Sequence, residues 1–118
     1  MKYVMLIHQA GVPTPESEEW QDVPADERAA VYRGYQAINE TPGVTPGHRL
    51  HPPETGATVR VEDGNVLVTD GPFVSAKEAI GGYLLFEADS LEDAIELACR
   101  IPTTRRGGAV EIRPATGE

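Results

Sequence analysis

The sequence predicts an α+β domain with the ferredoxin-like arrangement, an antiparallel sheet with two helices packed on one face. Three observations support this prediction. Strand and helix patterns follow one another in the order strand, helix, strand, hairpin, strand, helix, strand. The chain has 118 residues, enough for one core, so residues 1–118 are interpreted as a single domain. Two of the strands are apolar on both faces, and helices on one face cannot cover both.

The first strand–helix–strand unit opens the chain. Both alternating sets of side chains are apolar in the first strand, over residues 2–8. Residues 11–22 are polar and are interpreted as a mobile flap. Pro24 suits the first turn of a helix that ends near residue 39, and a short strand is predicted over residues 47–51, before two prolines. The helical spacing predicts a buried stripe made of Val31, Tyr35 and Ile38.

The clearest local signal is a β-hairpin over residues 58–69, inserted between the two halves. Alternating strands flank Asp63-Gly64, and a two-residue Asp-Gly loop favours a type I′ turn. The second strand of the hairpin leads directly to Asp70. The register set by this turn places four valines on one face, in the pairs Val61–Val66 and Val59–Val68.

The second half repeats the strand–helix–strand unit. Residues 80–87 form a strand that is again apolar on both faces, and the closing strand covers residues 109–113. Ser90, with Asp93 three residues later, resembles a capping box and begins a helix that ends before Pro102. The predicted apolar stripe of this helix is Leu91, Ala94, Ile95, Ala98 and Ile101, with Cys99 as a small buried residue beside them.

The strands over residues 2–8 and 80–87 need a cover for their second face. The helices occupy one face only, so the apolar side chains of the other face would meet water. The same face of a second copy is the simplest cover. We therefore expect a homodimer whose two sheets stack face to face.

Composition excludes several classes of partner and site. Nineteen acidic and ten basic side chains give a formal net charge of −9, which argues against nucleic acid because that affinity depends on clustered Lys and Arg. No apolar run approaches the ~20 residues of a membrane span, and the apolar run at residues 3–7 is too short for a signal peptide. We therefore expect a cytoplasmic protein. One cysteine and three histidines without a metal-ligand spacing predict no disulfide, no metal site and no cofactor.

The candidate site is centred on Asp70-Gly71-Pro72-Phe73. Gly71 permits a positive φ and Pro72 fixes φ at about −65°, so the strand must turn directly after Asp70, with Phe73 able to fold back over it. Gly71, Pro72 and Phe73 are candidate substrate-binding residues. Two compatible interpretations of Asp70 stay open. Its carboxylate caps its own turn, or it lies partly buried in a pocket between the sheet end and the helices, where it suits proton transfer.

Other side chains are candidates to act with Asp70. His8 ends the first strand and is either a half-exposed polar residue or an assisting acid–base group, and His51 is a second candidate for that role. Lys77 either forms a solvated pair with Glu78 or holds an anionic substrate. Tyr83 is expected in the core, and the alternative is that its hydroxyl lines a pocket.

Four stretches match one family and together cover almost the whole chain in order: residues 1–7, residues 50–61, residues 68–83 with the Asp-Gly-Pro-Phe corner, and residues 107–114. On these stretches the chain resembles the YCII-related proteins of the DGPF subgroup, in the dimeric α/β-barrel superfamily. The resemblance implies the same dimeric barrel that the apolar strand faces suggest.

The resemblance also bears on activity. Most members are uncharacterised and are often encoded near extracytoplasmic-function sigma factors. Some relatives in the wider group are enzymes that act on small aromatic or lactone-like compounds, and a His-Asp pair has been proposed as their active site. The Gly-Pro corner and Asp70 carry over to this chain. The helix histidine does not, since residues 24–39 contain none, and His8 is a candidate replacement if the sheet places the end of the first strand near Asp70.

Two functional hypotheses follow. The first is a cofactor-free small-molecule enzyme with isomerase- or lyase-like acid–base chemistry, in which Asp70 is central and His8 or His51 assists. The second is a non-catalytic homodimer that binds a ligand or a regulatory protein partner, with a link to sigma-factor regulation. The substrate is not predictable from the sequence.

Overall fold

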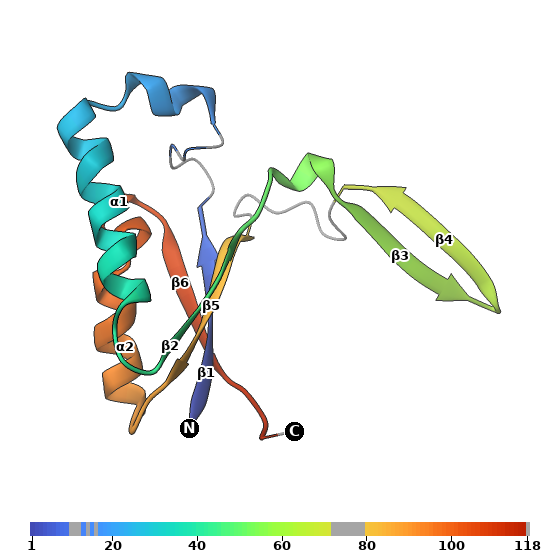
Figure 1. Cartoon of the computed structure of the whole chain (residues 1–118). Coiled ribbons are helices and arrows are strands. Elements are labelled where there is room, and N and C mark those ends of the chain that lie inside the picture. Colours follow the sequence, from blue (N-terminus) through green and yellow to red (C-terminus); the bar gives the residue numbers. More distant parts are fainter. Residues whose placement is uncertain (10–12, 14, 16, 72–79, 118) are drawn as a thin grey trace.

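The computed structural model describes residues 1–9, 13, 15, 17–71 and 80–117. An antiparallel sheet has the strand order β2-β5-β1-β6, and helices α1 and α2 lie side by side on one of its faces (Figure 1). This is the α+β sandwich that the sequence predicts. The elements of this body are β1 (Lys2–His8), α1 (Ala25–Asn39), β2 (Val44–Arg49), β5 (Ile80–Glu87), α2 (Leu91–Arg100) and β6 (Ala109–Pro114).

The core lies between the sheet and the helices. Strand β1 is central and pairs antiparallel with both β5 and β6. Residues paired directly across strands share a face, and Met5 is paired with Leu84 and Ile112 on the face toward the helices. Met5 is fully buried, as are Ile38 of α1 and Leu97 of α2 at the centre of this core.

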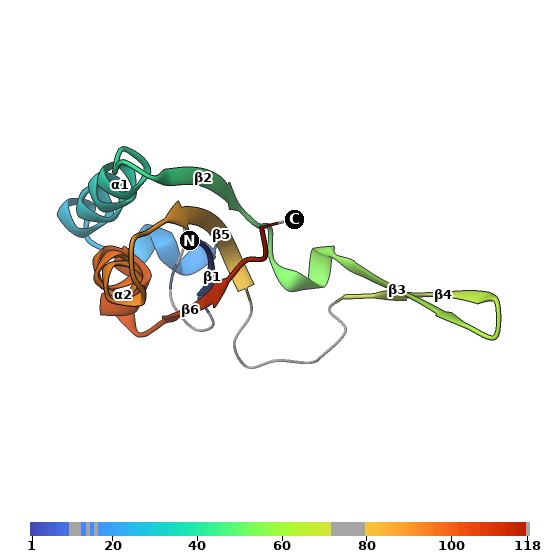
Figure 2. The same ribbon diagram turned by 90° about the horizontal axis from the view of Figure 1, so that it is seen from below.

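The opposite face of the sheet is left open by the helices, as Figure 2 shows. Val4, paired with Leu85, and Leu6, paired with Tyr83, lie on this face. Val4, Leu6 and Leu85 are half-buried, and Tyr83 is 38% exposed. The prediction that β1 and β5 are apolar on both faces is therefore confirmed, and one of these faces has no helix over it. We call this surface the open sheet face.

Helix α1 follows the prediction, and helix α2 corrects it in part. The Ser90 hydroxyl accepts a 3.2 Å hydrogen bond from the Asp93 amide, as the capping box predicts. The predicted burial of Leu91, Ile95 and Cys99 is wrong, because all three are exposed. The buried stripe is Ala94, Leu97, Ala98 and Ile101. At about 100° per residue, Ile95 lies about 110° and Cys99 about 150° from the centre of that stripe.

Strand β2 begins three residues earlier than predicted and ends at Arg49. The strand therefore includes Pro46, a residue that has no amide hydrogen to donate to a neighbouring strand. Strand β2 is at the edge of the sheet, where a proline that faces away from the neighbouring strand is tolerated. His51 therefore lies beyond the strand, directly before Pro52.

The segment predicted as a flap is only partly described. Residues 18–22 form a 3-10 helix, and Trp20 within it is buried together with Val23 and Val31. The Arg106 guanidinium carbon lies 5.5 Å from the centre of the Trp20 ring. The prediction of a mobile flap is wrong for this part, because Trp20 anchors it to α1. Residues 10–12, 14 and 16 of the same segment are outside the described residues.

The hairpin forms a separate two-stranded sheet of β3 (Ala57–Glu62) and β4 (Asn65–Asp70), which projects away from the body (Figures 1 and 2). We call residues 57–70 the arm. Asp63 and Gly64 have φ of 51° and 77°, which confirms the type I′ turn, in which both loop residues need positive φ. The predicted valine pairs are confirmed: Val61 with Val66 and Val59 with Val68.

Candidate functional site

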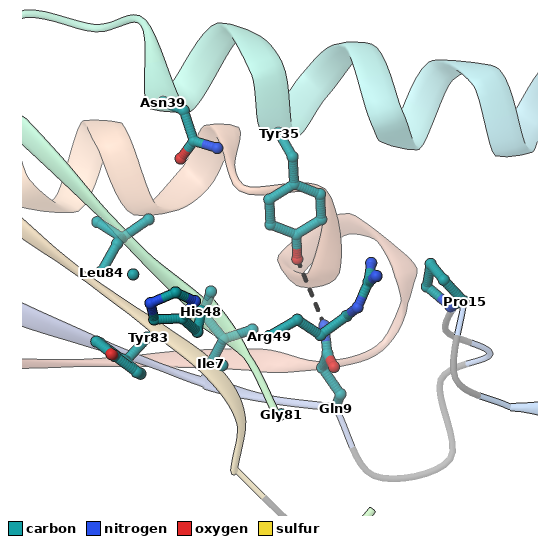
Figure 3. A pocket seen from close by; sticks show the side chains of 12 residues that line it. Ile7, Gln9, Pro15, Tyr35, Asn39, His48, Arg49, Gly81, Tyr83 and Leu84 are labelled. Carbon is teal, nitrogen blue, oxygen red and sulfur yellow. Dashed lines mark hydrogen bonds between the residues drawn. The ribbon is translucent and has the colours of Figure 1, made fainter. Parts of the chain in front are cut away.

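A cavity of about 190 Å³ opens at the end of the sheet from which the arm leaves, beneath α1 (Figure 3). Ile7 of β1, Leu84 of β5 and Pro15 supply apolar parts of its lining. The polar side chains that line it are Gln9, Tyr35, Asn39, His48, Arg49 and Tyr83. A mostly apolar hollow with a few converging polar groups is the usual form of a small-molecule site.

A hydrogen-bonded group of three side chains forms the wall under α1. The Tyr35 and Thr103 hydroxyl oxygens lie 2.6 Å apart, and Gln9 Nε2 donates to Thr103 at 3.2 Å and to Tyr35 at 3.5 Å. Thr103 is only 3% exposed, so this contact ties Tyr35 to the segment after α2. The phenol oxygen of Tyr35 is thereby held in one direction at the cavity wall.

The opposite wall is formed where β2 runs beside β5. The His48 and Tyr83 rings lie with centroids 6.2 Å apart at 59° to each other. A Cβ at Gly47 would collide with the Tyr83 carbonyl oxygen and ring, and one at Gly82 would lie 3.2 Å from the His48 carbonyl oxygen. Glycine at both positions therefore allows the strands to approach and sets the width of the cavity. The Arg49 side chain extends from β2 toward Pro15 (Figure 3).

A second pair of polar side chains, His8 and Glu111, lies on the open sheet face. His8 Nε2 is 3.3 Å from Glu111 Oε1, and the His8 side chain is 19% exposed. The other ring nitrogen of His8, Nδ1, is buried and has no hydrogen-bond partner among the described residues. A carboxylate on one imidazole nitrogen orients the ring. This arrangement can support acid–base catalysis at the end of β1.

Of the sequence-predicted site residues that the structure describes, Tyr83 alone lines the cavity. Gly71 has φ of 88°, as its place in the corner predicts, and its amide donates to the Gly56 carbonyl at 2.8 Å. Asp70 is exposed at the end of β4 and is not among the residues that line the cavity. The predicted partial burial of Asp70 is therefore wrong for the single chain, because the hairpin stands away from the sheet. His51 is exposed beyond β2 and does not line the cavity.

The remaining predicted residues divide into two groups. Pro72, Phe73 and Lys77 lie outside the described residues. Tyr83 is 38% exposed and is among the residues that line the cavity, so the expectation of a core position is wrong. Its partner strand is an edge strand with a glycine opposite the ring, which leaves the ring at the surface.

Sequence reasoning missed Gln9 and assigned Tyr35 only to the apolar stripe of α1. One local signal was available for Tyr35, because its hydroxyl on a buried stripe needs a polar partner. The partners, Gln9 and Thr103, are 26 and 68 residues away and carry no local signal. His48 lay within the predicted strand over residues 47–51 and was not chosen as a candidate, because its place beside β5 depends on tertiary contacts.

Two further properties of the described residues bear on the site. No group of three or more His, Cys, Asp or Glu side chains among them is arranged to hold a metal ion. Within the same residues, the helices are too short or too polar to cross a bilayer.

Comparison with known proteins gives a family, a relative and a structural neighbour. The family model of the YCII-related domain matches residues 1–116. An uncharacterised protein of Rhizobium meliloti is 30% identical over 112 residues, which are 94% of this chain and 88% of that protein. The solved structure of 5-chloro-2-hydroxyhydroquinone dehydrochlorinase from Burkholderia phenoliruptrix, in complex with 2,5-dihydroxybenzoquinone, matches with a TM-score of 0.51 and 18% identity. That match covers 98% of this chain and 94% of the other, and shows a shared fold.

Proposed function

The chain belongs to the YCII-related domain family, and on this basis we propose that it is an enzyme that performs acid–base chemistry on a small ring compound. The cavity carries this proposal. Its volume is about 190 Å³, and an apolar cavity of about 150 Å³ is enough to bind benzene. A single ring with a few substituents therefore suits this space.

The lining suggests how such a ring is held. Ile7 and Leu84 offer apolar contact for the ring, and the phenol of Tyr35 offers a hydrogen bond to its hydroxyl or carbonyl oxygens. The guanidinium of Arg49 is the cation in the lining and suits a phenolate or carboxylate substituent. The proposed substrate class is thus an aromatic or quinone-like ring with at least one anionic or hydroxyl group.

His48 is the proposed acid–base group. Among the side chains that line the cavity, imidazole is the one best suited to exchange a proton near neutral pH. The structural neighbour is named as a dehydrochlorinase of a chlorinated hydroxyhydroquinone and holds a dihydroxybenzoquinone. That protein's substrate is a hydroxylated ring, which supports the substrate class proposed here. The proposed reaction needs no cofactor, since it consists of proton transfers and loss of a leaving group.

His8 is a second candidate for the acid–base role, favoured by its contact with Glu111. It points to the open sheet face, where we also propose that a second copy of the chain stacks. Val4, Leu6 and Leu85 form an apolar centre on that face, which supports a homodimer. The non-catalytic alternative, a dimer that binds a regulatory partner, stays a prediction from the sequence.

A ligand screen tests the proposal. The full chain is mixed with phenols, hydroquinones, quinones and aromatic carboxylates, and its melting temperature is measured. A ligand at 100 times its Kd stabilises the fold by about 2.7 kcal/mol, which is on the order of 10 °C for a domain of this size. Each compound that binds is then incubated with the protein, and products are sought by mass spectrometry.

Four variants assign the result. Arg49→Gln and His48→Gln change the cavity lining, and His51→Gln is the matched control, because His51 is exposed outside the cavity. We expect Arg49→Gln to weaken binding, His48→Gln to abolish turnover and His51→Gln to match the wild type. If His8→Gln abolishes turnover and His48→Gln does not, the chemistry belongs to the open sheet face. If no compound of these classes binds, the proposal is wrong.

A further inference from the structure

The two faces of the arm differ sharply in polarity. Val59, Val61, Val66 and Val68 lie on one face and are 61–66% exposed. The other face carries Thr58, Arg60, Glu62, Asn65 and Thr69, with Leu67 as its one large apolar side chain. Strict alternation of this kind is the pattern of a strand pair with one face against protein and the other in water. We call the first surface the valine face.

The arm does not bury the valine face on its own body. Figures 1 and 2 show it directed away from the sheet and the helices. An isolated two-stranded ribbon is marginally stable in water, because it has no third layer to pack against. The valine side chains stabilise the arm only if another protein surface packs against them.

The chain is less compact and exposes more surface than a folded monomer of its length and mass. The radius of gyration is 16.1 Å, against about 13.5 Å for a compact domain of this length. The accessible surface is 7987 Å², against about 6,200 Å² for a folded monomer of this mass. The excess is about 1,800 Å² per chain, or about 3,600 Å² for two chains, which is the range of permanent homodimer interfaces.

A second apolar surface on the same chain indicates which protein covers the valine face. The open sheet face carries Val4, Leu6 and Leu85, and the arm leaves the body on the side of this face (Figure 2). A second copy stacked on the open sheet face would therefore lie beside the arm. Twofold symmetry would place the second arm beside the first chain in the same way.

We propose that the valine face of the arm packs on a second copy of this chain, the copy whose open sheet face lies against its own. Each chain is then clasped by the other's arm. The inference rests on the homodimer proposed above and is independent of the cavity. Asp70 follows Val66 and Val68 on the same face, at the base of the arm, so its carboxylate lies at the border of this contact.

Two variants of equal charge change test the arm. Val66→Lys/Val68→Lys places two cations on the valine face, and Asn65→Lys/Thr69→Lys places two on the polar face of the same strand. Association of the full chain is measured by sedimentation equilibrium over a range of concentrations. We expect the wild type and the polar-face variant to dimerise, and the valine-face variant to associate at least about 100-fold more weakly. Equal dissociation constants for all three proteins, or a monomeric wild type, would overturn the proposal.

A second measurement uses the wild type alone, so it does not depend on how a variant folds. Amide hydrogen exchange is followed in the arm above and below the dissociation constant of the dimer. We expect residues 57–70 to be protected only in the dimer, because a docked arm cannot fray as a free ribbon does. Arm amides that exchange equally fast at both concentrations would contradict the clasp even if the sheets stack. The ligand screen has a separate readout, so failure there leaves this result standing.

Discussion

The hydroxyl oxygens of Tyr35 and Thr103, 68 residues apart in sequence, lie 2.6 Å from each other at the wall of the cavity. The contact joins α1 to the 3-10 helix that follows α2, Pro102–Arg106. It serves the fold, because it pairs a hydroxyl that is almost fully buried. It also serves the proposed site, because it aims the phenol of Tyr35.

Tyr35→Phe should therefore destabilise the fold. Removing the phenol oxygen leaves the buried Thr103 hydroxyl with Gln9 alone, and we expect a loss of about 1–2 kcal/mol in the free energy of unfolding. Urea denaturation measures that loss. Tyr32→Phe is the control, because Tyr32 is 52% exposed. A Tyr35→Phe protein as stable as the control would show that the pair contributes nothing net.

Gly47→Ala should close part of the cavity without changing a polar group. The added Cβ would meet the Tyr83 backbone and ring, so β2 and β5 must separate or the ring must move. We expect a ligand found in the screen to bind at least about 10-fold more weakly. A loss of about 1.4 kcal/mol in binding free energy, caused by the shifted strands or ring, is enough for that change. Titration calorimetry measures the affinity. Gly117→Ala, which adds its Cβ in open space, should bind as the wild type does.

Gly34→Ala separates helix propensity from packing. Alanine is the better helix former by about 1 kcal/mol, so propensity alone predicts a more stable protein. The structure predicts the opposite, because a Cβ at Gly34 would lie 2.7 Å from Cγ of Pro102, a rigid ring. We expect a net loss of about 1–2 kcal/mol on thermal or urea unfolding, since overpacking costs about 1–3 kcal/mol. A higher melting temperature for this variant would mean that α1 shifts to admit the methyl group.

Glu111→Gln should distinguish a structural from a catalytic role for His8. Both side chains keep an oxygen that can accept from His8 Nε2, and Glu111 is about half exposed, so stability should change by less than about 0.5 kcal/mol. If His8 transfers the proton, loss of the carboxylate should lower kcat with little change in KM. If His48 transfers it, kcat should stay at the wild-type value. Steady-state kinetics on a substrate from the screen decide between the two histidines.

Much of the secondary structure could be predicted because its signals are local. The Asp63-Gly64 turn depends on the backbone freedom of two adjacent residues, and it was predicted with its register. The Ser90 cap depends on residues three apart. The errors arose where a neighbouring element decides the outcome, as at Pro46, which is admitted because β2 is an edge strand.

The candidate site was predictable to a smaller extent. The Asp-Gly-Pro-Phe corner drew attention to Asp70, and the structure puts that carboxylate on the arm, in the exposed part of the chain. Tyr83 was named, and it is among the residues that line the cavity. Gln9 could not have been found, because its partners belong to α1 and to the segment after α2.

By itself, the sequence determined the order of the elements, the hairpin turn, the alternation of the arm and the apolar character of both faces of β1. Each of these follows from backbone preferences and side-chain periods that act within a few residues. Only the tertiary structure decided where the cavity lies, which histidine enters it and how His8 meets Glu111, 103 residues away. Those relationships depend on the packing of α1 and α2 on the sheet and on the pairing of β1 with β6, which bring together side chains with no local reason to meet.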